Sequence, residues 1–109
     1  MTVEMLAGLP DFKTAAGGGK GREITGIYCC DLLSIVMGRA PADSAWVTVM
    51  ANVNALGVAS LADVACIVLA EGMTLEPEVL AKAEEQEIAV LYTALPIYEA
   101  AQCIGAAMA

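Results

Sequence analysis

A run of six consecutive apolar residues, ACIVLA at 65–70, constrains the fold of this chain most strongly. Its length suits a β-strand, and apolar side chains on both faces are typical of a strand covered on both sides. Apolar and β-branched stretches at 24–30, 46–51 and 88–92 predict further strands. Weak alternation over residues 2–6 predicts one more short strand.

Stretches with helical patterns separate these strands. The expected helices cover residues 32–37, 54–61, 77–86 and 96–108. Asp31 and Asn54 stand at the expected N-caps of the first two, and Pro77 lies in the first turn of the third. Strands that alternate with helices predict βαβ units. We therefore expect an α/β fold, a three-layer sandwich whose mostly parallel sheet of about five strands is covered by helices on both faces.

The length of 109 residues predicts a single domain over 1–109, with a flexible glycine-rich loop at about 13–22. Hydrophobic residues make up 59 % of the chain and charged residues 17 %, below the usual ~25 %. A monomer of this composition would expose part of its apolar surplus. We therefore expect a homodimer, with a second protein as a further candidate partner.

The net charge of −8 argues against a nucleic-acid partner, which needs clustered cations. Residues 44–109 hold one cation, Lys82, and eight anions. The longest uncharged stretch, 44–62, is long enough to span a bilayer, but Asn52 and Asn54 interrupt it, so we expect no membrane segment.

Four cysteines and no histidine limit the possible chemistry. No two cysteines have C-x-x-C spacing, so we expect reduced, buried thiols in a cytoplasmic protein, and neither a metal site nor a cofactor. Ser-His-Asp and Cys-His nucleophile systems are excluded. An enzyme would have to use a carboxylate or a thiol, such as Asp31 or Cys30.

The glycines at 17–21 invite comparison with phosphate-binding loops. A Walker A loop would need glycine in place of Thr14 and serine or threonine in place of Gly21, and the dinucleotide fingerprint does not fit either. We interpret the segment as a flexible connection. The alternative is that Lys20 and Arg22 hold an anion weakly.

Polar residues follow the predicted strands. In a parallel sheet, Asp31, Asn52, Asn54 and Thr93 would gather at the carboxyl ends of the strands, where such sheets bind ligands. They are the candidate ligand-binding residues. The alternative is that Asp31 and Asn54 only cap helices.

Much of the chain after residue 22 resembles the DRTGG domain family. The similar stretches are 22–28, 31–34, 36–40, 46–49, Asn54, 58–68, 71–72 and 83–85. The name-giving motif keeps only Arg22, Thr25 and Gly26. Asn52 stands where these domains often have histidine, and Gln86-Glu87 stands where they tend to close a helix with glycine.

The resemblance implies a fold like the N-terminal domain of HPr kinase/phosphorylase, without its kinase domain and phosphate loop. Such domains occur as non-catalytic modules beside nucleotide-binding regulatory domains and help form dimer contacts. Stand-alone versions are similar to small proteins encoded near iron-only hydrogenase components. We therefore expect a non-enzymatic regulatory or protein-interaction module that is homodimeric through an alanine-rich apolar face and associated with hydrogenase or redox metabolism. The alternative is a small-ligand sensor, for example for a nucleotide.

Overall fold

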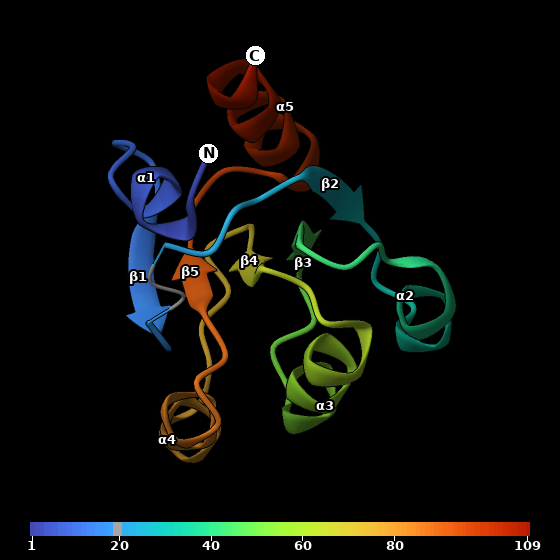
Figure 1. Ribbon diagram of the computed structural model, residues 1–109. Coiled ribbons are helices and arrows are strands. Elements are labelled where there is room, and N and C mark those ends of the chain that lie inside the picture. The colour runs from blue at the N-terminus through green and yellow to red at the C-terminus, as the bar shows by residue number, and fades with distance from the viewer. Residues whose placement is uncertain (19–20) are drawn as a thin grey trace.

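The computed structural model describes residues 1–18 and 21–109 as an α/β fold built on one five-stranded sheet (Figure 1). In chain order the elements are α1 (Val3–Ala7), β1 (Lys13–Ala16), β2 (Gly26–Cys29), α2 (Leu33–Arg39), β3 (Ser44–Thr48), α3 (Val53–Ala62), β4 (Cys66–Leu69), α4 (Pro77–Glu85), β5 (Val90–Tyr92) and α5 (Ile97–Met108).

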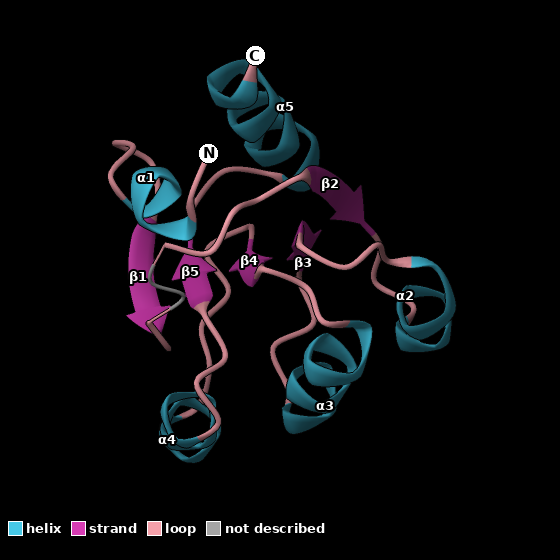
Figure 2. Cartoon of the chain, viewed as in Figure 1, coloured by secondary structure: helices cyan, strands magenta, loops and turns pink. Residues whose placement is uncertain are grey.

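The strand order is β1-β5-β4-β3-β2. Strands β2 to β5 pair in parallel, whereas β1 runs antiparallel to β5, with an irregularity between Thr14 and Ala16 (Figure 2). The sheet is therefore mixed, and the expectation of a mostly parallel sheet is corrected. Strand β1 is the first in sequence and has no helical crossover from a parallel neighbour to orient it, so it can pair in the opposite direction.

Residues 1–18 differ most from the predicted structure. Residues 3–7 form a helix instead of a strand, because the Thr2 hydroxyl oxygen accepts from the Met5 amide at 3.2 Å and caps it. Strand β1 occupies the beginning of the expected loop at 13–22, because β5 offers it a pairing edge. Gly19 and Lys20 lie outside the described residues, so the expected flexibility there is not tested.

Alternate strand residues pack on opposite faces of the sheet. Ala45 and Val47 of β3 belong to a core with residues of α1 and α5, whereas Trp46 belongs to a second core with residues of α2, α3 and α4. Figure 1 shows α1 and α5 on one side of the sheet, and α3 and α4 on the other. Trp46 is fully buried, and its indole Nε1 donates to the Cys30 carbonyl at 2.8 Å.

The connections between the parallel strands explain this arrangement. Helices α2, α3 and α4 each join neighbouring parallel strands and all contribute to the same core, as repeated right-handed crossovers require. After β5 the chain passes to the opposite face, where α5 packs against β2 and β3. Added at Gly105, a Cβ atom would stand 3.6 Å from the Ile27 Cδ1, so α5 lies close to the sheet.

Candidate functional site

Asp31 follows β2, and its carboxylate links two strand ends. Its Oδ1 accepts from the Thr48 hydroxyl at 2.6 Å and from the Val49 amide at 3.0 Å. The prediction that Asp31 caps the following helix is therefore wrong: Leu32 is the N-cap of α2, without a side-chain hydrogen bond. The carboxylate holds the end of β2 against the end of β3.

The N-cap of α3 is not the asparagine that the sequence predicted. Asn52, not Asn54, is the N-cap of α3, and its Oδ1 accepts from the Ala55 amide at 3.1 Å. Asn54 lies within α3 and is exposed. Asn52 is therefore the residue that fixes the start of α3, which sequence analysis assigned to Asn54.

Thr93 follows β5 and is buried, with 3 % of its surface exposed. Its hydroxyl oxygen accepts from the Leu95 amide at 3.2 Å. Strand β4 separates β5 from β3, so at ~4.8 Å per strand Thr93 stands about 10 Å across the sheet from the end of β3. The predicted residues share one end of the sheet but divide into two groups, with Asp31 and Asn52 in one and Thr93 in the other.

Arg22 lies at the opposite, amino end of the sheet. Its guanidinium donates to the Asp43 Oδ1 at 2.9 and 3.1 Å and to the Asp63 Oδ1 at 3.0 Å. Partial burial lowers the pKa of Arg22, but the hydrogen bonds and charges of the two aspartates outweigh that effect and raise it. Both aspartates have left-handed backbones, with φ of 65° and 57°.

Since two carboxylates occupy the Arg22 guanidinium, the suggestion that Arg22 holds an anion is not supported. The guanidinium instead joins the turns that precede β3 and β4. Lys20, the other residue of that suggestion, lies outside the described residues.

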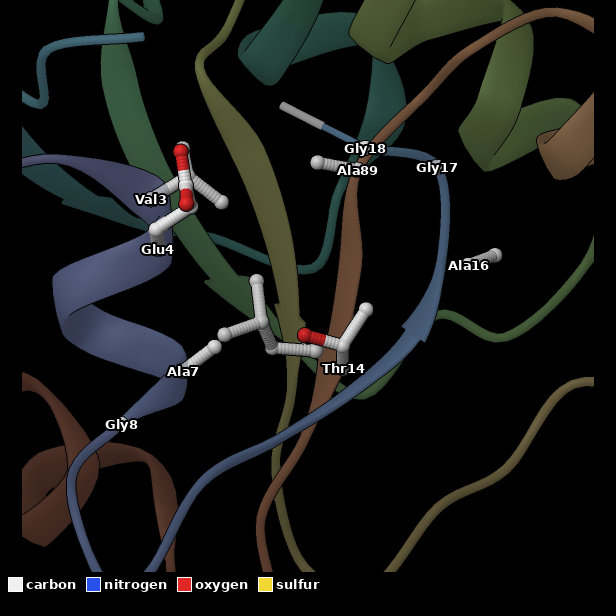
Figure 3. A pocket seen from close by; sticks show the side chains of 10 residues that line it. Val3, Glu4, Ala7, Gly8, Thr14, Ala16, Gly17, Gly18 and Ala89 are labelled. Atoms are coloured by element: carbon white, nitrogen blue, oxygen red, sulfur yellow. The ribbon is translucent and has the colours of Figure 1, made fainter. Parts of the chain in front are cut away.

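The described part of the glycine-rich segment is engaged by carboxylates. The Gly17 amide donates to the Glu84 Oε1 at 3.1 Å, and the Gly21 amide donates to the Glu4 Oε1 at 2.8 Å. Glu4 and Thr14 line a cavity of about 310 Å³ between α1 and β1 (Figure 3). An anion at this segment would meet negative charge, which argues against a phosphate-binding role for the described part of the segment.

The four cysteines are free thiols, but only Cys66 is buried. Burial raises the pKa of the Cys66 thiol to about 12. Cys29 is exposed, so the expectation that all four thiols are buried is wrong. Partial desolvation and the nearby Asp31 charge raise the pKa of Cys29, which disfavours its reactive thiolate form.

Neither a metal-ion cluster nor a membrane-spanning helix occurs among the described residues. No cluster of three or more Cys, Asp and Glu side chains there could hold a metal ion. None of the helices described is both long and apolar enough to cross a membrane.

The largest group of exposed apolar side chains lies on α2 and α3. Of the eight large hydrophobic side chains that the structure places at the surface, five belong to these helices or to the N-cap of α2. They are Leu32, Ile35, Met37, Val53 and Leu61, and we name them the α2–α3 outer face. Leu61 is 74 % exposed. Residues 32–40 and 53–62 contain one charged side chain, Arg39.

Helix α3 carries apolar residues on both sides, with the polar Asn54 and Ser60 also exposed. Leu56 and Val58 are buried toward the sheet, whereas Val53 and Leu61 are exposed eight residues apart, with Gly57 midway between them. Residues at this spacing share one face of a helix. A Cβ atom added at Gly57 would meet nothing within 4 Å, so the middle of this face is open. The absence of charge over 53–62 is the sequence signal for this surface.

Comparison with known proteins adds no assignment: neither the family models nor the curated proteins contain a match to this chain.

Proposed function

We propose that this chain is a cytoplasmic, non-enzymatic interaction module that forms a homodimer through the α2–α3 outer face. The observation that carries the proposal is the outward side of α3, where Val53, Gly57 and Leu61 present apolar and small residues without charge. A surface helix in a monomer ordinarily has a polar outer side. An apolar outer side gains stability when it is covered.

The energetic gain from covering this face is substantial. Full burial of one Leu, Val, Ile or Met side chain contributes roughly 1.5–3 kcal/mol. In a two-fold dimer each residue of the interface is buried twice, once on each copy. Even partial burial of five side chains per copy offers enough apolar area to offset the entropy lost on association.

Charge favours a second copy on this face in particular. Two chains with a net charge of −8 repel each other, so they associate best where acidic side chains are sparse. Helix α4, on the same side of the sheet, carries Glu78, Glu84 and Glu85, whereas α3 carries no charged residue. The open positions at Gly38 and Gly57 also allow two helices to approach closely.

The groups considered for catalysis have other roles. Asp31 accepts two hydrogen bonds within the fold, and the Cys30 thiol donates to the Leu32 carbonyl at 3.8 Å. The resemblance to DRTGG domains agrees with a non-catalytic, dimer-forming module. It also suggests a regulatory setting in hydrogenase or other redox metabolism.

Cross-linking at the centre of the face tests this proposal. In a Cys29→Ser background, Gly57→Cys should give a covalent dimer with a short bis-maleimide, because the dimer brings the two α3 helices together. Ala81→Cys, at an exposed position of α4, is the matched control and should give no covalent dimer. Equal cross-linking at both positions, or none at Gly57→Cys, contradicts the proposed interface.

A further inference from the structure

A second cavity, of about 350 Å³, opens at the carboxyl ends of β4 and β5. Its lining includes Asp11, Phe12, Lys13, Met73, Tyr92 and Thr93. They come from the segment entering β1, the loop after β4, and the end of β5. Its volume lies in the usual range for small-molecule sites.

The topology places a crevice at this point. The chain leaves β4 toward α4 on one face of the sheet and leaves β5 toward α5 on the other, so the two neighbouring loops diverge. Open α/β sheets bind ligands where connections diverge in this way, beyond the carboxyl ends of the strands. Between β2 and β4 the successive connections stay on one face, so no such opening arises there.

Hydrogen bonds fix the walls of this cavity. The Glu71 and Gly72 amides donate to the Leu95 and Thr93 carbonyls at 2.9 and 3.0 Å, which ties the two loops together at their base. The Tyr92 hydroxyl accepts from the Leu75 amide at 2.9 Å. A ligand therefore meets a preformed site and need not order it.

The lining combines apolar walls with one buried hydroxyl. Phe12 is 4 % exposed and packs in the core with α1 and α5, so the apolar walls come from the half-buried Tyr92 and from the exposed, flexible Met73. The Thr93 oxygen already accepts from the Leu95 amide, so its hydroxyl hydrogen is available to an acceptor in the cavity.

Two opposite charges flank the apolar part. Asp11 and Lys13 precede and follow Phe12 and are exposed, and neither forms an ion pair with another described residue. They give the lining no net charge. A nucleotide, with several negative charges, would find one cation there, within a chain of net charge −8.

We propose that this cavity binds a small zwitterion with an apolar side chain, the chemistry of an α-amino acid such as leucine, methionine or phenylalanine. Lys13 and the Thr93 hydroxyl bind the carboxylate, and Asp11 binds the ammonium. Met73 and Tyr92 cover the apolar side chain. The site lies at the β1–β5 side of the sheet, away from the α2–α3 outer face, and does not rest on dimer formation.

Isothermal titration with L-leucine, L-methionine and L-phenylalanine tests this site. We expect saturable binding of at least one of them, and binding about tenfold weaker or worse for 3-phenylpropionate and phenethylamine, which each lack one charge. No saturable binding of any of the three amino acids overturns the proposal. So does binding of AMP as tight as that of the best amino acid.

Variants locate the binding. Lys13→Met and Asp11→Asn should each weaken amino-acid binding about tenfold, and Ala94→Phe, at an exposed lining position, should abolish it by filling the cavity. Lys82→Met on α4 is the matched control and should bind normally. Thermal melts confirm that each variant is folded. Unchanged affinity in folded Lys13→Met and Ala94→Phe places the binding elsewhere and refutes this site.

Discussion

Helices α3 and α4 cover the same face of the sheet but present opposite surfaces to the outside. Helix α4 buries Ala83 and exposes Glu78, Lys82, Glu84 and Glu85, as a helix in contact with water does. Helix α3 buries an apolar side and exposes Val53 and Leu61 together with polar but uncharged residues, Asn54 and Ser60.

The difference shows that burial against the sheet does not explain the composition of α3. Only the inner side of α3 packs against the sheet, through residues such as Leu56 and Ala59. The outer side has to be explained by contact with something else, which we propose to be a second copy.

The largest expected effect concerns the inner sides. Leu56→Ala should lower the free energy of unfolding by about 2–5 kcal/mol, because Leu56 is 1 % exposed and its loss leaves a cavity. Leu80→Ala on α4 should cost less than about 2 kcal/mol, because Leu80 is already half-buried. Urea unfolding at equal protein concentration measures both. Equal losses would show that the two helices contribute alike to the core.

The second largest effect concerns the outer sides of α3 and α4, where an added charge should change dimer affinity differently. Leu61→Glu should weaken the dimer about 100-fold or more, because each copy would bury a charge in place of an apolar side chain. Ala81→Glu on α4 adds the same charge at an exposed position and should change the dissociation constant little. Sedimentation velocity over a dilution series gives both constants. A dimer that tolerates Leu61→Glu as well as Ala81→Glu would place the interface elsewhere.

The helix starts provide a smaller contrast. Asn52→Ala should lower the free energy of unfolding by about 1 kcal/mol, because it removes the acceptor for the Ala55 amide. Glu76→Ala should have an effect of only a few tenths of a kcal/mol, since Glu76 makes no side-chain cap hydrogen bond to α4. Thermal melts show which of the two variants loses more stability. A larger loss from Glu76→Ala would reverse the assignment of the caps.

The smallest expected effect is that of salt on the dissociation constant of the dimer. Raising sodium chloride from low to physiological concentration should strengthen the dimer a few-fold, because salt screens the repulsion between two acidic chains. The proposed face offers little charge pairing for salt to weaken. A dimer that weakens as salt is added would indicate an interface held by ion pairs, contrary to an uncharged α3 face.

The sequence predicts well those elements whose own apolar pattern identifies them. Residues 65–70 are apolar throughout because β4 is buried on both faces, and α5 has a clear helical period after Pro96. Strand β1 could not be predicted, because KTAA has no strand pattern and becomes a strand only by pairing with β5. Thr2 followed by a turn of helix was a capping signal that the weak alternation of 2–6 obscured.

The candidate sites were less predictable than the fold. Asp31, Asn52 and Thr93 were correctly expected after strands, but the sequence does not reveal that β4 separates them or that Asp31 is engaged by Thr48. The cavity beside Thr93 depends on Phe12 and Met73, which are brought there by the antiparallel pairing of β1 and the loop after β4. Only the tertiary arrangement places these residues together.

Sedimentation equilibrium of the unchanged chain tests the central claim most directly. If the outer side of α3 is covered by a second copy, the species at micromolar concentration should have twice the chain mass of 11.2 kDa and should dissociate on dilution. A mass that stays at 11.2 kDa up to high micromolar concentration would contradict the homodimer and leave the apolar outer side of α3 without its proposed partner.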